Sequence, residues 1–183
     1  MVQGEFSVCG EKKVTLSHEF SGTVVEVGQM AARKFRPGDR VGVDPNRPCH
    51  CCQFCTRGQV HFCQDGGCRD ASGVFRDGGA ARLCLVPAEQ VFLLPPSVSL
   101  ETGALCEPLS CILHGWDRLV AASPPQPDHK VLVTGAGIIG NLWVTMFHHH
   151  GVRNVTVSEP ALGRRRITQH LGKDRDSWGR DGL

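Results

Sequence analysis

The chain has 183 residues, a length that suits one ordinary domain or one domain joined to part of another. Its composition is globular, with 40% hydrophobic and 21% charged residues, which excludes disorder as the dominant state. Lys and Arg number 20 against 18 Asp and Glu, so the chain lacks a strong basic field and nucleic acid is excluded as its main partner.

The first half of the chain is predicted to form short strands separated by turns. β-Branched residues between glycines predict a strand over residues 22–28, and a Pro-Gly turn leads into a second strand within residues 34–44. A third strand is predicted over residues 80–87. Short strands broken by glycine and proline favour a small barrel or sandwich.

Beyond Ser97 the spacing of apolar residues becomes helical. Apolar side chains recur from Leu105 to Leu119, and Pro108 within this stretch predicts two short helices, the second starting at the proline with Glu107 just before it. The proline-rich residues 121–128 are expected to form a linker.

A single β-α-β unit is predicted after this linker. It consists of a strand over residues 130–134 that is buried on both faces, a glycine turn, a helix over residues 138–150 and a strand over residues 154–158. Residues 131–147 are the longest charge-free apolar stretch, but they are short for a membrane span and rich in glycine. Residues 173–183 carry almost no apolar side chains, and we expect a disordered tail there.

The N-terminal sequence also has no apolar core of the kind a signal peptide needs. We therefore expect a cytoplasmic protein with no membrane partner. In that compartment thiols stay reduced, and clustered cysteines more often bind metal than form disulfides.

Four cysteines in the polar lobe formed by residues 47–69 have the spacing C-x2-C-x2-C-x7-C. They are Cys49, Cys52, Cys55 and Cys63. Four thiolates this close can form a tetrahedral Zn²⁺ site, and such a metal would supply the folding free energy of a lobe that is poor in apolar residues. The site would be structural, because four protein ligands leave no open position. Reduced structural cysteines or a disulfide pair are the alternative, and Cys51 is not expected to be a ligand.

A G-x-G-x-x-G turn follows the predicted strand at residues 130–134 and opens the predicted helix. Its predicted cofactor contacts are Gly135, Gly137, Ile139 and Gly140. In this context the turn favours dinucleotide binding, with the pyrophosphate at the helix N-terminus. Glu159, nineteen residues after Gly140, would accept the ribose hydroxyls and favour NAD(H) over NADP(H), although Arg164–Arg166 weaken that preference. A purely structural glycine turn is the alternative.

Taken in order, the motifs resemble the zinc-containing medium-chain alcohol dehydrogenases. Three segments show this resemblance: LSHEFSGTVVEVG at residues 16–28, PGDRVGVDP with the cysteines after it, and ALCEPLSCILHG at residues 104–115. The last of these is similar to the sorbitol and polyol dehydrogenase branch. The resemblance runs from about residue 14 to residue 172. It implies an α/β fold with a mainly β N-terminal part, in which a GroES-like β-barrel catalytic domain is followed by the start of a Rossmann coenzyme domain.

This resemblance also implies domain boundaries. Residues 1–120 would form the GroES-like catalytic domain, incomplete at its N-terminus, and residues 121–129 the linker. Residues 130–172 would form the first β-α-β of an incomplete NAD-binding domain, before the tail at residues 173–183.

The resemblance implies a catalytic zinc site that involves His18, Glu19 and Glu107. His18 matches a zinc ligand, Glu19 matches a residue that can also ligate the metal, and Glu107 matches the position that holds the zinc-bound water in the polyol branch. From the residues alone, a surface pair is the better interpretation of His18 and Glu19, and Glu107 could be a carboxylate that favours a helix start. Adjacent strand residues point to opposite faces, so joint coordination requires a bend. The family's first cysteine ligand would lie upstream of Met1, which leaves the catalytic site incomplete, and Ser17 replaces the family's usual glycine.

The implied function is a zinc-dependent oxidoreductase that transfers hydride from a small alcohol or polyol to NAD. Intact relatives are expected to be homo-oligomers. The alternative is a catalytically inactive, truncated zinc-binding form that at most associates with a full-length partner. An isolated zinc-ribbon interaction module is a third reading, which the motifs outside the lobe disfavour.

Overall fold

The computed structural model describes residues 13–173, and the chain divides between Glu107 and Pro108 into two compact units. The first unit contains strands β1 (Ser21–Thr23), β2 (Arg40–Val43) and β3 (Val91–Leu93), and helix α1 (Leu100–Gly103). Helix α2 (Cys106–Ala122) begins at the last residues of this unit. The second unit continues with β4 (Val131–Thr134), α3 (Ile138–His149), β5 (Val155–Ser158) and α4 (Leu162–Lys173).

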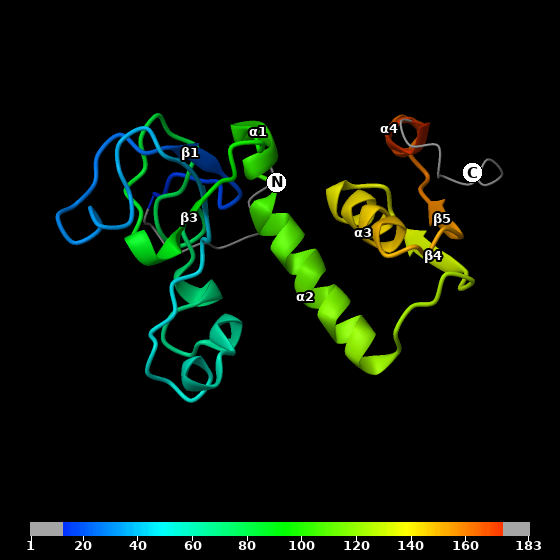
Figure 1. Ribbon diagram of the computed structural model, residues 1–183, viewed down its shortest axis with the longest axis horizontal. Coiled ribbons are helices and arrows are strands. Elements are labelled where there is room, and N and C mark those ends of the chain that lie inside the picture. Colours follow the sequence, from blue (N-terminus) through cyan, green and yellow to red (C-terminus); the bar gives the residue numbers. More distant parts are fainter. Residues whose placement is uncertain (1–12, 174–183) are drawn as a thin grey trace. The chain divides into compact units, whose positions relative to one another are not determined.

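An antiparallel sheet in the order β1-β2-β3 forms the framework of the first unit (Figure 1). Val41 pairs with Gly22 on one side and with Leu93 on the other. The side chains of Phe35, Val41 and Val91 are buried together and form the core of this unit. The sheet and its core therefore provide a rigid base for the loops on either side of it.

Two strand predictions in this unit are wrong in extent or in kind. The predicted strand at residues 22–28 ends at Thr23. The Val24 amide still donates to the Asp39 carbonyl, but the Val24 carbonyl accepts from Gly38, because the Asp39 amide is bonded to Arg36 within the Pro-Gly turn. Residues 80–87 are not a strand, and Leu83 and Leu85 are 71% and 99% exposed. Val86 packs partly buried against the core, but the segment pairs with no strand among the described residues. The third strand is instead β3, which was not predicted.

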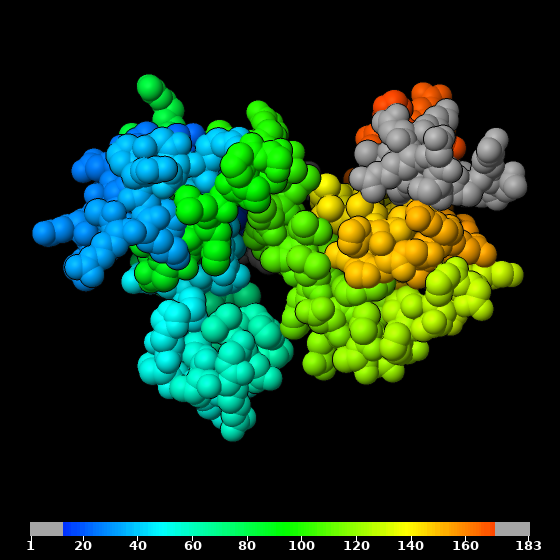
Figure 2. Space-filling model, viewed as in Figure 1, coloured from blue at the N-terminus to red at the C-terminus, as the bar shows by residue number. Residues whose placement is uncertain are grey.

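The cysteine lobe at residues 47–69 contains no strand longer than a single bridge and is built from short 3-10 turns. Two of these turns are Cys55–Arg57 and Val60–Phe62. Figure 2 shows the lobe, cyan to teal, as a projection from its unit. Cys63 is its one buried side chain, 5% exposed.

In the second unit β4 and β5 pair in parallel, with Val131 opposite Val155, and α3 connects them. This confirms the predicted β-α-β unit. Apolar residues of α2 and α3 pack against one face of the strands. The buried members of this core are Ile112, Trp116, Met146, Phe147 and Val152.

The prediction that the first strand of this unit is buried on both faces is wrong. Leu132 is 64% exposed, while its neighbours Val131 and Val133 pack against the core. Only one face of the two-stranded sheet is covered by elements that the structure describes within this unit. A parallel sheet is normally covered on both faces.

The helical spacing of apolar residues from Leu105 to Leu119 is confirmed, because almost all of this stretch lies in α2. The prediction that Pro108 divides this stretch into two short helices is wrong, because α2 runs through the proline from Cys106 to Ala122 and α1 lies before the stretch. Pro108 is the third residue of α2, where its missing N–H belongs to the first turn and needs no partner. Helix α4 was not predicted, and Lys173, assigned to the tail, is its last residue. Residues 174–183 lie outside the described part, and the domain boundaries at residues 121–129 stay a prediction.

Within residues 13–173, no helix is both long enough and apolar enough to cross a membrane.

Candidate metal and dinucleotide sites

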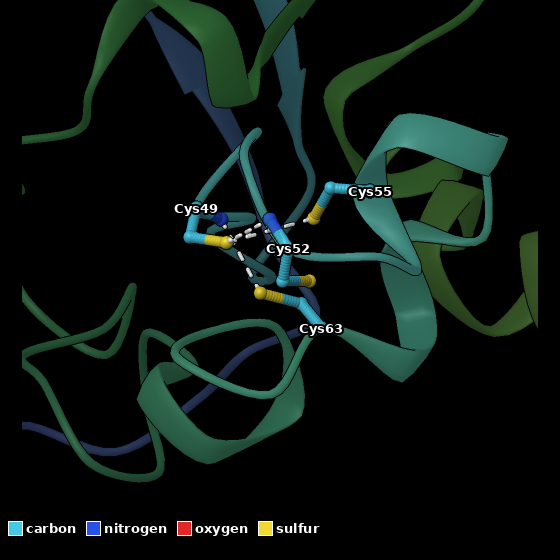
Figure 3. Close-up of side chains that lie close together, drawn as sticks. All are labelled: Cys49, Cys52, Cys55 and Cys63. Atoms are coloured by element: carbon cyan, nitrogen blue, oxygen red, sulfur yellow. Dashed lines mark hydrogen bonds between the residues drawn. The ribbon is translucent and has the colours of Figure 1, made fainter.

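The four lobe cysteines converge on one point. Each offers a sulfur, and the four sulfurs all lie within 4.8 Å of one another. The sulfurs of Cys49 and Cys55 are 3.9 Å apart, and Figure 3 shows all four side chains pointing toward a common centre. This is a closed donor set of the kind that suits tetrahedral zinc.

Backbone geometry at two glycines makes this convergence possible. Gly67 donates its amide to the Arg47 carbonyl at 2.8 Å and has a φ of 58°, which favours glycine. A Cβ added at Gly66 would overlap the same carbonyl. The two glycines therefore bring Cys63 back beside the start of the lobe, where its sulfur accepts the Cys49 amide at 3.3 Å.

Local hydrogen bonds favour the thiolate form of two of the four cysteines. The backbone amides of Cys55 and Gln64 lower the pKa of Cys52 to about 6, and those of Cys51 and Cys52 lower the pKa of Cys49. Burial and the neighbouring thiols raise the pKa of Cys55 to about 12. A bound cation would neutralise this crowded group, because thiolates are its ligands.

Cys51 lies next to the cluster but outside it. Its thiol is exposed, and a hydrogen bond with the Cys49 side chain raises its pKa. It does not belong to the set of four converging sulfurs.

A second cluster joins His18 and Glu19 to Glu107, in the first turn of α2. One ligand atom from each side chain lies within 4.8 Å of the others, and His18 Nε2 is 3.9 Å from Glu19 Oε1. The chain bends at His18 and Glu19, so the geometry that joint coordination requires is present. One imidazole nitrogen and two carboxylate oxygens are ligands that zinc accepts.

This second cluster is open to solvent. The side chains of His18 and Glu19 are 41% and 47% exposed. Among the described residues the cluster contains three ligands, so a metal held there would keep a position for a further ligand. Such an open position is what a catalytic site needs and a structural site lacks.

The glycine turn lies between β4 and α3, as predicted. Gly135 has a φ of 93°, which an L-residue rarely adopts, and a Cβ added at Gly140 would overlap the Gly135 carbonyl. Gly137 caps the N-terminus of α3, and Ile139 in the first turn of the helix is half exposed. The first turn of α3 therefore presents backbone amides beside a turn where a phosphate can approach closely.

Glu159 lies against this turn. Its carboxylate accepts the amide of Ala136 at 2.9 Å and that of Ala161 at 2.8 Å. The bond from Ala136 has the largest effect in lowering the pKa of Glu159, followed by the bond from Ala161. Arg164 Nη1 lies 3.9 Å from Glu159 Oε2. Only 8% of the residue is exposed. Glu159, which directly follows β5, thus holds the glycine turn in place through the Ala136 amide.

Two residues that sequence reasoning missed fix the other side of Ala136. Asn141 donates its amide nitrogen to the Ala136 carbonyl at 3.2 Å and accepts a 2.8 Å hydrogen bond from the Thr168 hydroxyl. A polar asparagine inside an apolar helix was a signal that could have pointed to Asn141. Thr168, in a helix that was not predicted, offered none.

Most of the chain is similar to known dehydrogenases. A model of the alcohol dehydrogenase GroES-like domain matches residues 1–96. The chain is 36% identical over 159 residues to L-threonine 3-dehydrogenase of Pyrococcus abyssi, a match that covers 87% of this chain and 43% of that protein. It is 29% identical over 164 residues to sorbitol dehydrogenase of Bombyx mori, covering 90% and 45% respectively.

A similar structure has been solved for a zinc-binding dehydrogenase of Sinorhizobium meliloti 1021 bound to NADP. It shares 39% sequence identity and a TM-score of 0.79 over 92% of this chain and 46% of that one. These matches confirm the expected GroES-like domain with the start of a coenzyme domain. The chain spans less than half the length of each of these three proteins.

Proposed function

Because the chain belongs to the zinc-containing medium-chain alcohol dehydrogenase family, we propose that it carries the metal-binding part of an oxidoreductase that transfers hydride from an alcohol to a nicotinamide cofactor. The observation that supports this proposal most strongly is the meeting of His18 and Glu19 with Glu107, from a distant part of the chain. Their ligand atoms form an open N/O site beside a separate, closed four-sulfur site.

The two sites would have different roles. Cys49, Cys52, Cys55 and Cys63 would hold a structural zinc that folds the lobe. His18, Glu19 and Glu107 would hold a second zinc in an orientation that leaves room for a substrate hydroxyl. Zinc bound at the second site would supply Lewis acidity toward that hydroxyl oxygen.

For the cofactor we propose a preference for NAD(H) over NADP(H). Each oxygen of the Glu159 carboxylate accepts one backbone amide, which leaves a lone pair on each for a ribose hydroxyl. The same negative charge would repel a 2′-phosphate, whereas Arg164 beside it acts in the opposite direction. The relative solved with NADP makes this preference worth measuring directly, by titrating the chain with NADH and with NADPH.

The proposed substrate is a small alcohol or polyol. Threonine and sorbitol appear in the names of the similar dehydrogenases, and both carry a secondary hydroxyl. We further propose a cytoplasmic location, because the four cysteines must stay reduced to bind metal. For intact relatives we expect homo-oligomers.

Turnover tests the proposal. The described residues supply three ligands of the open site and two strands of a coenzyme sheet, so the chain alone is expected to give no measurable NAD⁺ reduction. Joining it to the segments of the Sinorhizobium relative that it does not match should give NAD⁺ reduction with threonine, sorbitol or xylitol.

His18→Ala should abolish that activity. His170→Ala, at an exposed position of α4 outside both clusters, should leave it unchanged. A folded, zinc-loaded chimera with no turnover on any of these substrates, or one that His18→Ala leaves active, would contradict the proposal.

A further inference from the structure

We infer that the loop formed by residues 73–79 positions His18 and Glu19, by holding Ser17 in the backbone conformation that turns both side chains toward Glu107. In its link to metal binding this inference rests on the proposed function. The loop itself contributes no ligand atom to the cluster.

The starting observation is the backbone of Ser17. Its φ is 79°, in the left-handed region that residues other than glycine, asparagine and aspartate rarely adopt. Consecutive side chains of an extended chain point to opposite faces. The departure at Ser17, followed by the bend at His18 and Glu19, places their ligand atoms on the same side.

The loop grips this segment through consecutive backbone hydrogen bonds. The amides of Gly78, Gly79 and Ala80 donate to the carbonyls of Thr15, Ser17 and Leu16 at 2.8, 2.9 and 3.0 Å respectively. Asp77 adds a bond in the reverse direction, because its Oδ1 accepts the Thr15 amide at 2.8 Å. The carbonyl of the strained residue is thus held directly by Gly79.

Two buried glycines allow the loop to come this close. A Cβ added at Gly78 or at Gly73 would overlap the Ser17 carbonyl, and the one at Gly73 would also lie 2.6 Å from the His18 nitrogen. Because both neighbours are backbone atoms, no side-chain rotation could relieve the overlap. Only hydrogen fits at these two positions.

One bond closes the loop on itself and another ties it to the segment before it, so it can act as a fixed support. Arg76 Nε lies 2.6 Å from Asp70 Oδ1, and the Gly73 amide donates to the Arg76 carbonyl at 2.7 Å. Gly73 itself has a φ of 75°, which a side chain would disfavour. A displaced loop would release the Ser17 carbonyl, and the segment could relax to an extended form that separates His18 from its two partners.

The test is Gly78→Ala, with Gly28→Ala as the matched control. Gly28 lies in the same unit, has an ordinary φ and would bring its Cβ within 4 Å of no other atom. The full chain, carrying its tightly held zinc, is titrated with further Zn²⁺ while the NMR signals of the His18 ring are followed.

We expect Gly78→Ala to weaken zinc binding at His18 by about ten- to hundredfold, the range typical of lost ligand support, while Gly28→Ala does not. The tightly held zinc should remain in both variants, which separates a local loss of position from global unfolding. Unchanged binding at His18 in Gly78→Ala would overturn the inference.

Amide exchange gives a second readout that does not depend on metal. In Gly78→Ala the Gly79 and Ala80 amides should exchange about tenfold faster or more than in Gly28→Ala, because their acceptors have moved. If the wild-type His18 ring does not respond to Zn²⁺, the proposed function fails, and the exchange rates decide the positioning role by themselves. Unchanged rates would then overturn it. Should Gly78→Ala fail to fold, Asp77→Ala removes the acceptor for the Thr15 amide and leaves both glycines in place, and the same readouts apply to it.

Discussion

Replacing one lobe cysteine should cost the chain its zinc and the lobe its fold. Cys52→Ser removes one of four sulfurs that lie within 4.8 Å of one another. Cys51→Ser removes the neighbouring thiol, which is exposed and outside that set. Both variants replace one sulfur atom by oxygen, and they do so at adjacent positions, so they form a matched pair.

The size of the effect follows from how little else holds the lobe together. Cys63 is the only buried side chain within residues 47–69. Full burial of even a large apolar side chain such as leucine stabilises by about 1.5–3 kcal/mol, whereas a structural zinc contributes about 10–16 kcal/mol. Loss of the metal should therefore unfold the lobe, while the core around Phe35, Val41 and Val91 remains intact.

Elemental analysis of chain purified without added metal provides the measurement, with limited proteolysis of the lobe beside it. Wild type and Cys51→Ser should each hold about one zinc, and Cys52→Ser less than about a third of one, with fast cleavage confined to the lobe. Wild-type zinc content in Cys52→Ser, or loss of zinc in Cys51→Ser, would show that these four sulfurs are not the site.

Three further predictions concern the other sites. Ser17→Gly should raise the free energy of unfolding by about 1 kcal/mol in urea titrations, because glycine adopts the left-handed conformation without strain; an unchanged value would argue that Ser17 is not strained. Thr168→Val should weaken NADH binding severalfold by calorimetry through loss of the hydrogen bond to Asn141, and Thr168→Ser should not. The pKa of Glu159 is lowered in the folded state, so its contribution to stability is complete above the ordinary carboxyl pKa and is lost as pH falls through the lowered value. Glu159→Gln should therefore flatten the acid side of the thermal stability profile, and an unaltered profile would exclude the bonds to Ala136 and Ala161 as the cause.

Several features of this chain were predicted from its sequence because they depend on neighbours along the chain. The cysteine spacing at residues 49–63 predicted a cluster, and the structure brings those four sulfurs together. The glycine turn at residues 135–140 was recognised from the strand before it and the helix after it, and both are present. Short spacings restrict geometry strongly, since few residues separate the groups that must meet.

Other features were decided only by tertiary structure. The bend that brings the side chains of His18 and Glu19 together depends on hydrogen bonds with a loop about sixty residues later in the chain. Glu107 joins the pair from a still more distant part of the first unit. Residues 80–87 have a strand pattern but no partner ladder, while β3 forms beside β2. In each case the outcome rests on contacts between residues far apart in the chain. Local propensity and periodicity carry no information about such contacts, because packing and hydrogen bonding across the fold determine them.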